Sequence, residues 1–109
     1  MISLEDFKKV DIVVGEILSA EKVPDTDKLL KLSVDLGELM PRQIVSGIYE
    51  YFPDCSILVG RKCMFVANLE PRVIKGIESQ GMILAVSTKD GKFSLLEPNG
   101  EIPAGARAR

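Results

Sequence analysis

Residues 28–36, KLLKLSVDL, decide the fold because polar and apolar side chains alternate along them. One set is wholly apolar and consists of Leu30, Leu32, Val34 and Leu36. The other set is largely polar and consists of Leu29, Lys31, Ser33 and Asp35. A period of two residues is typical of a β-strand with one face against a core and the other in water. We therefore expect a sheet protein with a one-sided core.

Further strand-like segments lie on both sides of this one, separated by turns rich in glycine and proline. We predict strands at residues 11–20, 42–46, 62–69, 82–86 and 92–96. Gly15 interrupts the first of these, which indicates a bulge or a sharp bend. Residues 3–7 predict a short helix that Ser3 can cap.

Several short strands with at most one short helix between them are typical of small all-β barrels. Five strands and an interposed helical turn in roughly 100 residues favour a five-stranded OB-fold barrel, and an SH3-like barrel is the alternative. We expect a single domain over residues 1–109, with a short N-terminal helix and a C-terminal extension. Apolar residues make up 46% of the chain, which is enough for a core at this size.

The aromatic residues of the segment YEYF, residues 49–52, have two interpretations. The simpler one is that they plug one end of the barrel from a helical turn. The alternative is that they stack on nucleobases.

The chain lacks the usual signals for membranes, metals and catalysis. It has no apolar run of about 18 residues, and its first residues do not resemble a signal peptide, so we expect a cytoplasmic protein. There is no histidine, and the only cysteines are Cys55 and Cys63, which we expect to be reduced thiols. These residues offer no usual zinc site and no Cys–His or Ser–His pair. With no phosphate-loop or dinucleotide motif either, we expect neither a cofactor nor an enzyme.

Charge is distributed unevenly along the chain. The net charge is −2, which argues against a basic nucleic-acid binder as a whole. Residues 1–60 hold six Lys/Arg and eleven Asp/Glu, whereas residues 61–109 hold eight and five. The second part could attract a polyanion, unless both parts interleave on the surface.

Residues 68–82, NLEPRVIKGIESQGM, differ from the strand-like segments around them, and we expect a loop there. Arg72 and Lys75 could contact phosphates, while Asn68, Ser79 and Gln80 could contact sugars and bases. Two glycines would allow close approach to the backbone, and Met82 could pack on a base. Taken singly, each residue also has a plain structural interpretation, as a solvated loop charge or a core side chain.

Six blocks in this order resemble the tRNA-binding OB-fold domain family. The blocks are DIVVGEI (residues 11–17), PDTDKLLKL (24–32), RQIVSGI (42–48), VGRK (59–62), ANLEPR (67–72) and GIESQGM (76–82). That family includes stand-alone tRNA-binding proteins, the C-terminal domain or beta subunit of methionyl-tRNA synthetase, a cytokine-precursor domain and a bacterial chaperone implicated in secretion. The resemblance covers about residues 4 to 106.

The resemblance implies a non-catalytic OB-fold homodimer that binds folded tRNA. Its N-terminal helix and C-terminal segment would form the dimer. The resemblance points to Asn68, Arg72, Ser79, Gln80 and Met82 as tRNA-binding residues. We add Lys75 for its charge, and Lys31, Arg42 and Ser46 because their strands could line the same face of the barrel. Glu70 stands where the family usually has a basic residue, which would lower affinity for phosphate.

Two further roles remain open on the same scaffold. The chain could assist a catalytic methionyl-tRNA synthetase chain as its beta subunit. Alternatively, the low net basicity and Glu70 fit an export-related chaperone that binds unfolded protein.

Overall fold

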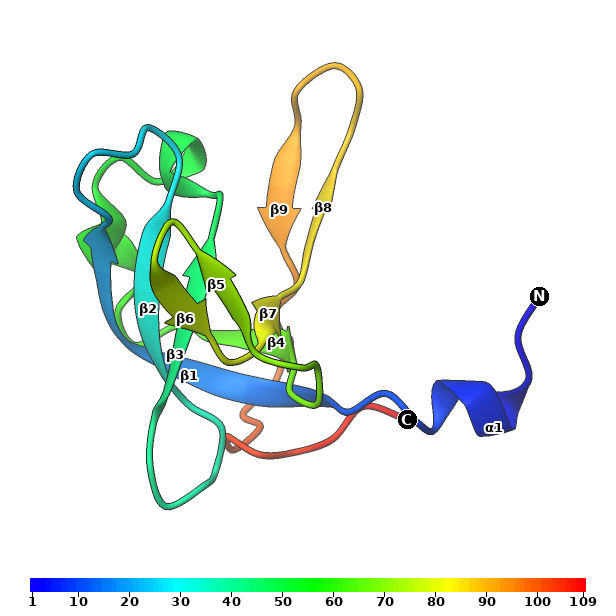
Figure 1. Ribbon diagram of the computed structural model, residues 1–109. Helices are drawn as coiled ribbons and strands as arrows, with labels where there is room; N and C mark the ends of the chain where they lie inside the picture. Colours follow the sequence, from blue (N-terminus) through cyan, green and yellow to red (C-terminus); the bar gives the residue numbers. More distant parts are fainter.

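The computed structural model describes residues 1–109 and contains a five-stranded antiparallel sheet with the strand order β3-β2-β1-β4-β7 (Figure 1). The five strands are β1 (Ile12–Lys22), β2 (Leu30–Asp35), β3 (Arg42–Ser46), β4 (Lys62–Val66) and β7 (Met82–Ile83). The sheet curls so that β3 approaches β7, and a nearly closed barrel results. The predicted all-β, OB-like fold is confirmed.

Strand β1 organises the barrel because it pairs with two neighbours in turn. Its residues 12–16 pair with β4, and its residues 16–22 pair with β2. The register shifts between Ile17 and Ser19, so the bulge lies near Leu18 and not at Gly15, where the sequence predicted a bulge or a sharp bend. Gly15 has a different task, because a Cβ there would lie 2.7 Å from side-chain atoms of Val34, Leu36 and Phe65. The glycine lets these core side chains close over β1.

The core lies inside the barrel, and the alternation in residues 28–36 is confirmed. Its four apolar residues are all buried, whereas Lys31, Ser33 and Asp35 are half-buried. The largest fully buried side chains are Phe65, Ile17, Leu30, Leu32, Ile44, Leu58, Val34 and Cys63. Such burial contributes roughly 1.5–3 kcal/mol for each large apolar side chain.

Two short 3₁₀ helices, η1 (Tyr49–Tyr51) and η2 (Cys55–Leu58), connect β3 to β4. Tyr49 and Phe52 pack against the core, as predicted for a plug. Tyr51 does not, because its side chain is 48% exposed and stacks on Phe93 with ring centroids 3.9 Å apart.

Two hairpins form where the sequence predicted a loop and a single strand. The predicted loop at residues 68–82 contains strands β5 (Arg72–Ile74) and β6 (Ile77–Ser79). The predicted strand at residues 82–86 is divided: β7 belongs to the barrel, while β8 (Ala85–Ser87) pairs with β9 (Phe93–Leu95) in a projecting hairpin (Figure 1). The strand predicted at residues 62–69 ends at Val66, after which the chain turns towards β5.

Helix α1 (Leu4–Phe7) forms as predicted and begins with a capping box between Ser3 and Asp6. None of its residues is buried, and it stands away from the barrel (Figure 1). The C-terminal residues run beside the start of β1, where the Val14 amide donates to Ala106 at 2.8 Å and the Ala108 amide to Ile12 at 2.7 Å. No helix in the chain has the length and apolar character needed to cross a lipid bilayer.

Candidate nucleic-acid interface

The β5–β6 hairpin presents the two cations that the sequence placed in a loop. Lys75 and Gly76 form its two-residue turn, with φ values of 52° and 81°. Positive φ at both positions is the requirement of a type I′ turn, which matches the twist of the strands. Arg72 begins β5 and lies opposite Ser79 in the register. The hairpin therefore holds Arg72 and Lys75 on the surface.

Neither cation is neutralised by a carboxylate. Eight of the fourteen Lys and Arg side chains form salt bridges, and Arg72 and Lys75 are not among them. The other cations without an acidic partner are Lys22, Lys62, Lys89 and Arg109. Both hairpin cations are exposed, so they are free to meet an anionic ligand.

Ser79 and Gln80 hold the hairpin to β3. The Ser79 side chain is buried, and its Oγ accepts from the Val45 amide at 3.0 Å and donates to the Gly81 carbonyl at 3.0 Å. The Gln80 Oε1 accepts from the Gln43 amide at 3.0 Å. The hydroxyl of Ser79 is therefore used within the fold, where it satisfies an amide on the exposed edge of β3.

Asn68 also bonds within the chain. Its Oδ1 accepts from the Asp11 amide at 2.8 Å, and its Nδ2 donates to the Lys9 carbonyl at 2.7 Å. The side chain thus fixes the segment that links helix α1 to β1. Glu70, two residues later, is exposed and has no hydrogen bond or salt bridge.

Arg42 joins three parts of the chain at the start of β3. Its Nε and one NH₂ group each donate at 2.8 Å to the Glu38 carboxylate. Its other NH₂ group donates to the Gln80 carbonyl at 3.0 Å and also to the Ala67 carbonyl. The paired charges and hydrogen bonds lower the pKa of Glu38 and raise that of Arg42.

Three neighbouring hollows make a groove across this face. The largest, of about 610 Å³, lies between the β2–β3 loop and residues 67–71, with Arg42 and Gln80 in its wall. A second, of about 250 Å³, shares those two residues and adds Lys31. A third, of about 60 Å³, is lined by Glu70, Arg72, Ser79 and Met82, among others. We call these hollows together the binding groove.

The binding groove and hairpin bring together seven of the nine predicted residues, though in different states, and Asn68 and Ser46 lie outside both. Lys31 lies in the groove but pairs with Glu21 at 2.7 Å. Met82 is 43% exposed at the edge of the groove. Lys75 is at the hairpin tip, and Asn68 is at the base of the segment that leads there. Ser46, at the end of β3, is half-buried and lines no part of the groove.

Sequence reasoning missed Glu38, Gln43 and Leu69. Glu38 neutralises Arg42, the Gln43 Nε2 donates to the Glu78 carbonyl at 2.9 Å, and Leu69 is a 45% exposed apolar side chain in the groove wall. The one available signal was the spacing of Glu38 and Arg42, four residues apart across a turn.

The groove offers charged, amide and apolar contacts to a ligand. No three His, Cys, Asp or Glu side chains come together as a possible metal site. Cys63, on β4, is buried in the hydrophobic core, and burial raises the pKa of its thiol to about 11. The groove combines exposed cations with amides and apolar edges, which suits a phosphate-bearing ligand.

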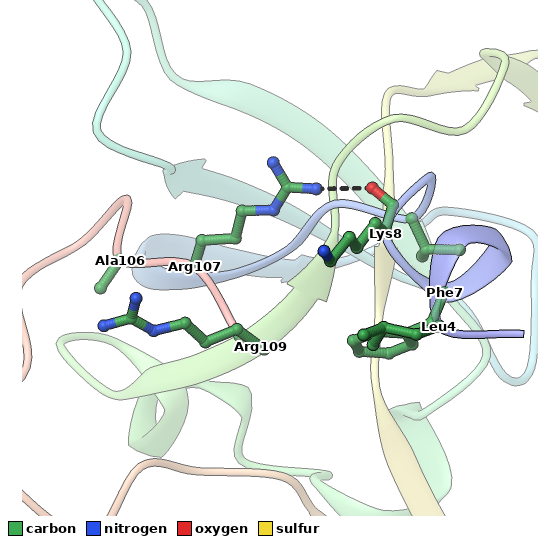
Figure 2. Close-up of a pocket in the computed structure, with 8 residues that line it drawn as sticks. Leu4, Phe7, Lys8, Ala106, Arg107 and Arg109 are labelled. Atoms are coloured by element: carbon green, nitrogen blue, oxygen red, sulfur yellow. Dashed lines mark hydrogen bonds between the residues drawn. The ribbon is translucent and has the colours of Figure 1, made fainter.

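A further hollow, of about 620 Å³, lies between α1 and the C-terminal residues (Figure 2). Figure 2 shows an Arg107 NH₂ group donating to the Lys8 carbonyl, at 2.9 Å. Leu4 and Phe7 from α1 face the same hollow. Leu4 is 65% exposed, so this apolar surface is uncovered in one copy of the chain.

Comparisons with known proteins identify the family of the chain. A family model described as "Putative tRNA binding domain" matches residues 12–107. The chain is 45% identical over 105 residues to a methionine–tRNA ligase of Enterococcus faecalis and 47% identical over 108 residues to that of Porphyromonas gingivalis. These matches cover 96% and 99% of the chain but only 16% of each ligase.

Solved structures resemble the chain over its full length. A MetRS-related protein from Pyrococcus horikoshii superposes with a TM-score of 0.91 at 41% identity, covering 100% of this chain and 98% of that one. The chaperone CsaA from Bacillus anthracis superposes with a TM-score of 0.87 at 29% identity, covering 100% and 99%. The family match and these similarities show that the chain belongs to the tRNA-binding domain family.

Proposed function

We propose that this protein binds folded tRNA through the binding groove and the β5–β6 hairpin, and that it does so without catalysing a reaction. The observation that carries the proposal is the pair of exposed, unneutralised cations, Arg72 and Lys75, beside a polar groove in a chain of this family. Cations of this kind attract phosphates, and the groove's amides and apolar edges would contact sugars and bases.

The site has few free positive charges, which limits its affinity. Arg42 and Lys31 are each paired with a carboxylate, and Glu70 and Glu78 lie close to the hairpin cations in the chain. A protein with a net charge of −2 gains little long-range attraction for RNA. We therefore expect moderate affinity that depends on the shape of the ligand and falls steeply with salt.

We also propose that the protein is a homodimer, joined through helix α1 and the C-terminal residues. The support is the uncovered apolar surface in Figure 2, to which Leu4, Phe7, Val10 and Ala108 contribute. Two copies would present two binding grooves to one large ligand and gain avidity. Sedimentation at micromolar concentration should give twice the 12.0 kDa mass of one chain, and a mass of 12.0 kDa would rule the dimer out.

Two settings fit a tRNA-binding dimer in the cytoplasm. The protein could work alone, or it could assist a methionyl-tRNA synthetase chain as a beta subunit. The second setting draws on the similarity to the methionine–tRNA ligases, of whose length the chain matches 16%. Co-purification with a synthetase chain would distinguish the two settings.

Binding of unfolded protein is a second candidate function. It is supported by the similarity to the chaperone CsaA and by the exposed side chains of Leu39 and Met40, which are 103% and 75% accessible. If this function holds, the protein should suppress aggregation of an unfolded client, and excess tRNA should leave that suppression unchanged.

The main proposal is tested by comparing three ligands: folded tRNA, an unstructured RNA of equal length and duplex DNA. Each is titrated at several salt concentrations between about 50 and 200 mM. We expect the tightest binding for tRNA and an affinity that decreases as salt rises. Equal affinity for all three ligands, or no binding to any, would show that the proposal is wrong.

A further inference from the structure

Arg42 has the geometry of a phosphate receptor whose place is already taken. Its Nε and one NH₂ group point along the same edge, and both donate at 2.8 Å to the two oxygens of Glu38. A guanidinium binds a phosphate through this same edge, with two parallel hydrogen bonds. The Glu38 carboxylate therefore occupies the position that a phosphate would take.

The opposite side of the guanidinium is anchored independently of Glu38. The second NH₂ group donates to the carbonyls of Ala67 and Gln80, which belong to the segments on either side of the β5–β6 hairpin. These bonds would hold Arg42 in place if Glu38 moved away. The receptor edge is thus already oriented towards the groove, and a ligand would not have to order it.

Glu38 is held much less firmly than Arg42. It lies in the β2–β3 loop, whose base is fixed because Gly37 donates to the Asp35 carboxylate at 2.8 Å. The tip of the loop carries Leu39 and Met40, both fully or largely exposed, so it has no packed anchor. The Glu38 side chain is itself 45% exposed. It can leave Arg42 without disturbing the core.

We propose that Arg42 is a phosphodiester-binding residue of the groove and that Glu38 blocks it until RNA displaces the carboxylate. This inference rests on the tRNA binding proposed above. It makes Glu38 an internal competitor that exchanges places with one backbone phosphate. Lys31, in the same groove, is paired with Glu21, but both of those residues lie on strands, where such an exchange is hindered.

The test compares Glu38→Gln with a matched control, Glu97→Gln. Glu97 binds Arg61 in the same two-point manner, at 2.7 and 3.1 Å, and neither residue lines the groove. Both variants remove one negative charge from one arginine pair. A general charge effect would therefore change their tRNA affinities equally, whereas a freed Arg42 would act only in Glu38→Gln.

We expect Glu38→Gln to bind folded tRNA about tenfold more tightly than the wild type at low salt, because RNA no longer has to break the charge-assisted pair between Arg42 and Glu38. Because Arg42 contacts the same phosphate in both complexes, the slope of log affinity against log salt should match that of the wild type. Glu97→Gln should keep the wild-type slope. Glu97→Gln should also keep the wild-type affinity. Equal changes of affinity in the two variants, or an unchanged affinity in Glu38→Gln, would overturn the inference.

Glu38→Gln could also strengthen binding by removing repulsion between the Glu38 carboxylate and RNA. The same substitution in an Arg42→Lys protein distinguishes this effect from release of the Arg42 guanidinium. Lysine keeps the positive charge but lacks the two-donor edge, so Glu38→Gln should gain less than about twofold there. A full gain in that background would overturn the assignment to Arg42. If the wild type binds tRNA and Glu38→Gln does not differ from it, only this inference fails. If no variant binds tRNA, the proposed function fails with it.

Discussion

Replacing Ser79 by alanine separates a structural role from a contact role for this residue. The Ser79 hydroxyl accepts from the buried Val45 amide at 3.0 Å and donates to the Gly81 carbonyl at 3.0 Å. The variant loses both bonds and leaves the Val45 N–H, which is buried, without a partner. An unsatisfied buried donor costs about 1–3 kcal/mol, so we expect the free energy of unfolding to fall by about 2 kcal/mol.

Thermal and urea unfolding measure this loss, and tRNA titration of the folded variant measures binding. A loss of about 2 kcal/mol should lower Tm by roughly 10 °C in a domain of this size. Because the hydroxyl is buried, the tRNA affinity of the folded variant should stay within about twofold of wild type. Ser46→Ala is the matched control: that hydroxyl has no hydrogen bond, and its removal should change stability by less than about 0.5 kcal/mol.

The reasoning about Ser79 would be refuted by the opposite pattern. In that pattern, Ser79→Ala would keep its stability and lose tenfold or more in tRNA affinity. The hydroxyl would then contact the ligand, and it would be exposed in the complex although it is buried in the free protein.

Three further substitutions test other parts of the structure. Glu70→Lys should raise tRNA affinity about tenfold, because Glu70 lines the groove beside Arg72. The free energy of unfolding should stay within about 0.5 kcal/mol of wild type, because Glu70 is exposed and has no partner. A lower tRNA affinity would contradict this prediction. Asn68→Ala should lower the free energy of unfolding by about 1–2 kcal/mol in urea, because two bonds to the main chain are lost, and an unchanged stability would contradict it. Two hydrogen bonds from Arg61 lower the pKa of Glu97 from its ordinary value of 4.5. The Arg61–Glu97 pair therefore stabilises the fold fully above pH 4.5 and less as the pH falls below it. Glu97→Gln should lose less stability than the wild type on acidification, and parallel curves of stability against pH would contradict this.

Local alternation was enough to predict strand β2 and its buried face. Residues 28–36 alternate because one face of β2 is buried, and Leu30, Leu32 and Val34 are all at most 1% exposed. The hairpin at residues 72–79 was missed for a local reason. Its strands are three residues long, and Lys75 adopts a positive φ that usually marks glycine or asparagine.

Long-range pairings explain what the sequence could not reveal about the site. Asn68 and Ser79 look like polar loop residues, but their partners are 57 and 34 positions away along the chain. Only the closed barrel brings them together. Arg72 and Lys75 could be proposed as phosphate contacts from the sequence alone, because their role as exposed charges does not depend on a distant partner in the chain.

The central claim, that the hairpin cations bind tRNA, is tested most directly by Arg72→Gln/Lys75→Gln against Lys62→Gln/Lys89→Gln. Each double variant removes two cations without salt bridges, but only the first pair lies on the β5–β6 hairpin. In a salt series with folded tRNA, we expect the first variant to bind at least tenfold more weakly than wild type, with a slope flatter by about 1.5–2. The second should match wild type. Equal losses in both variants, or an unchanged slope in the first, would contradict the claim.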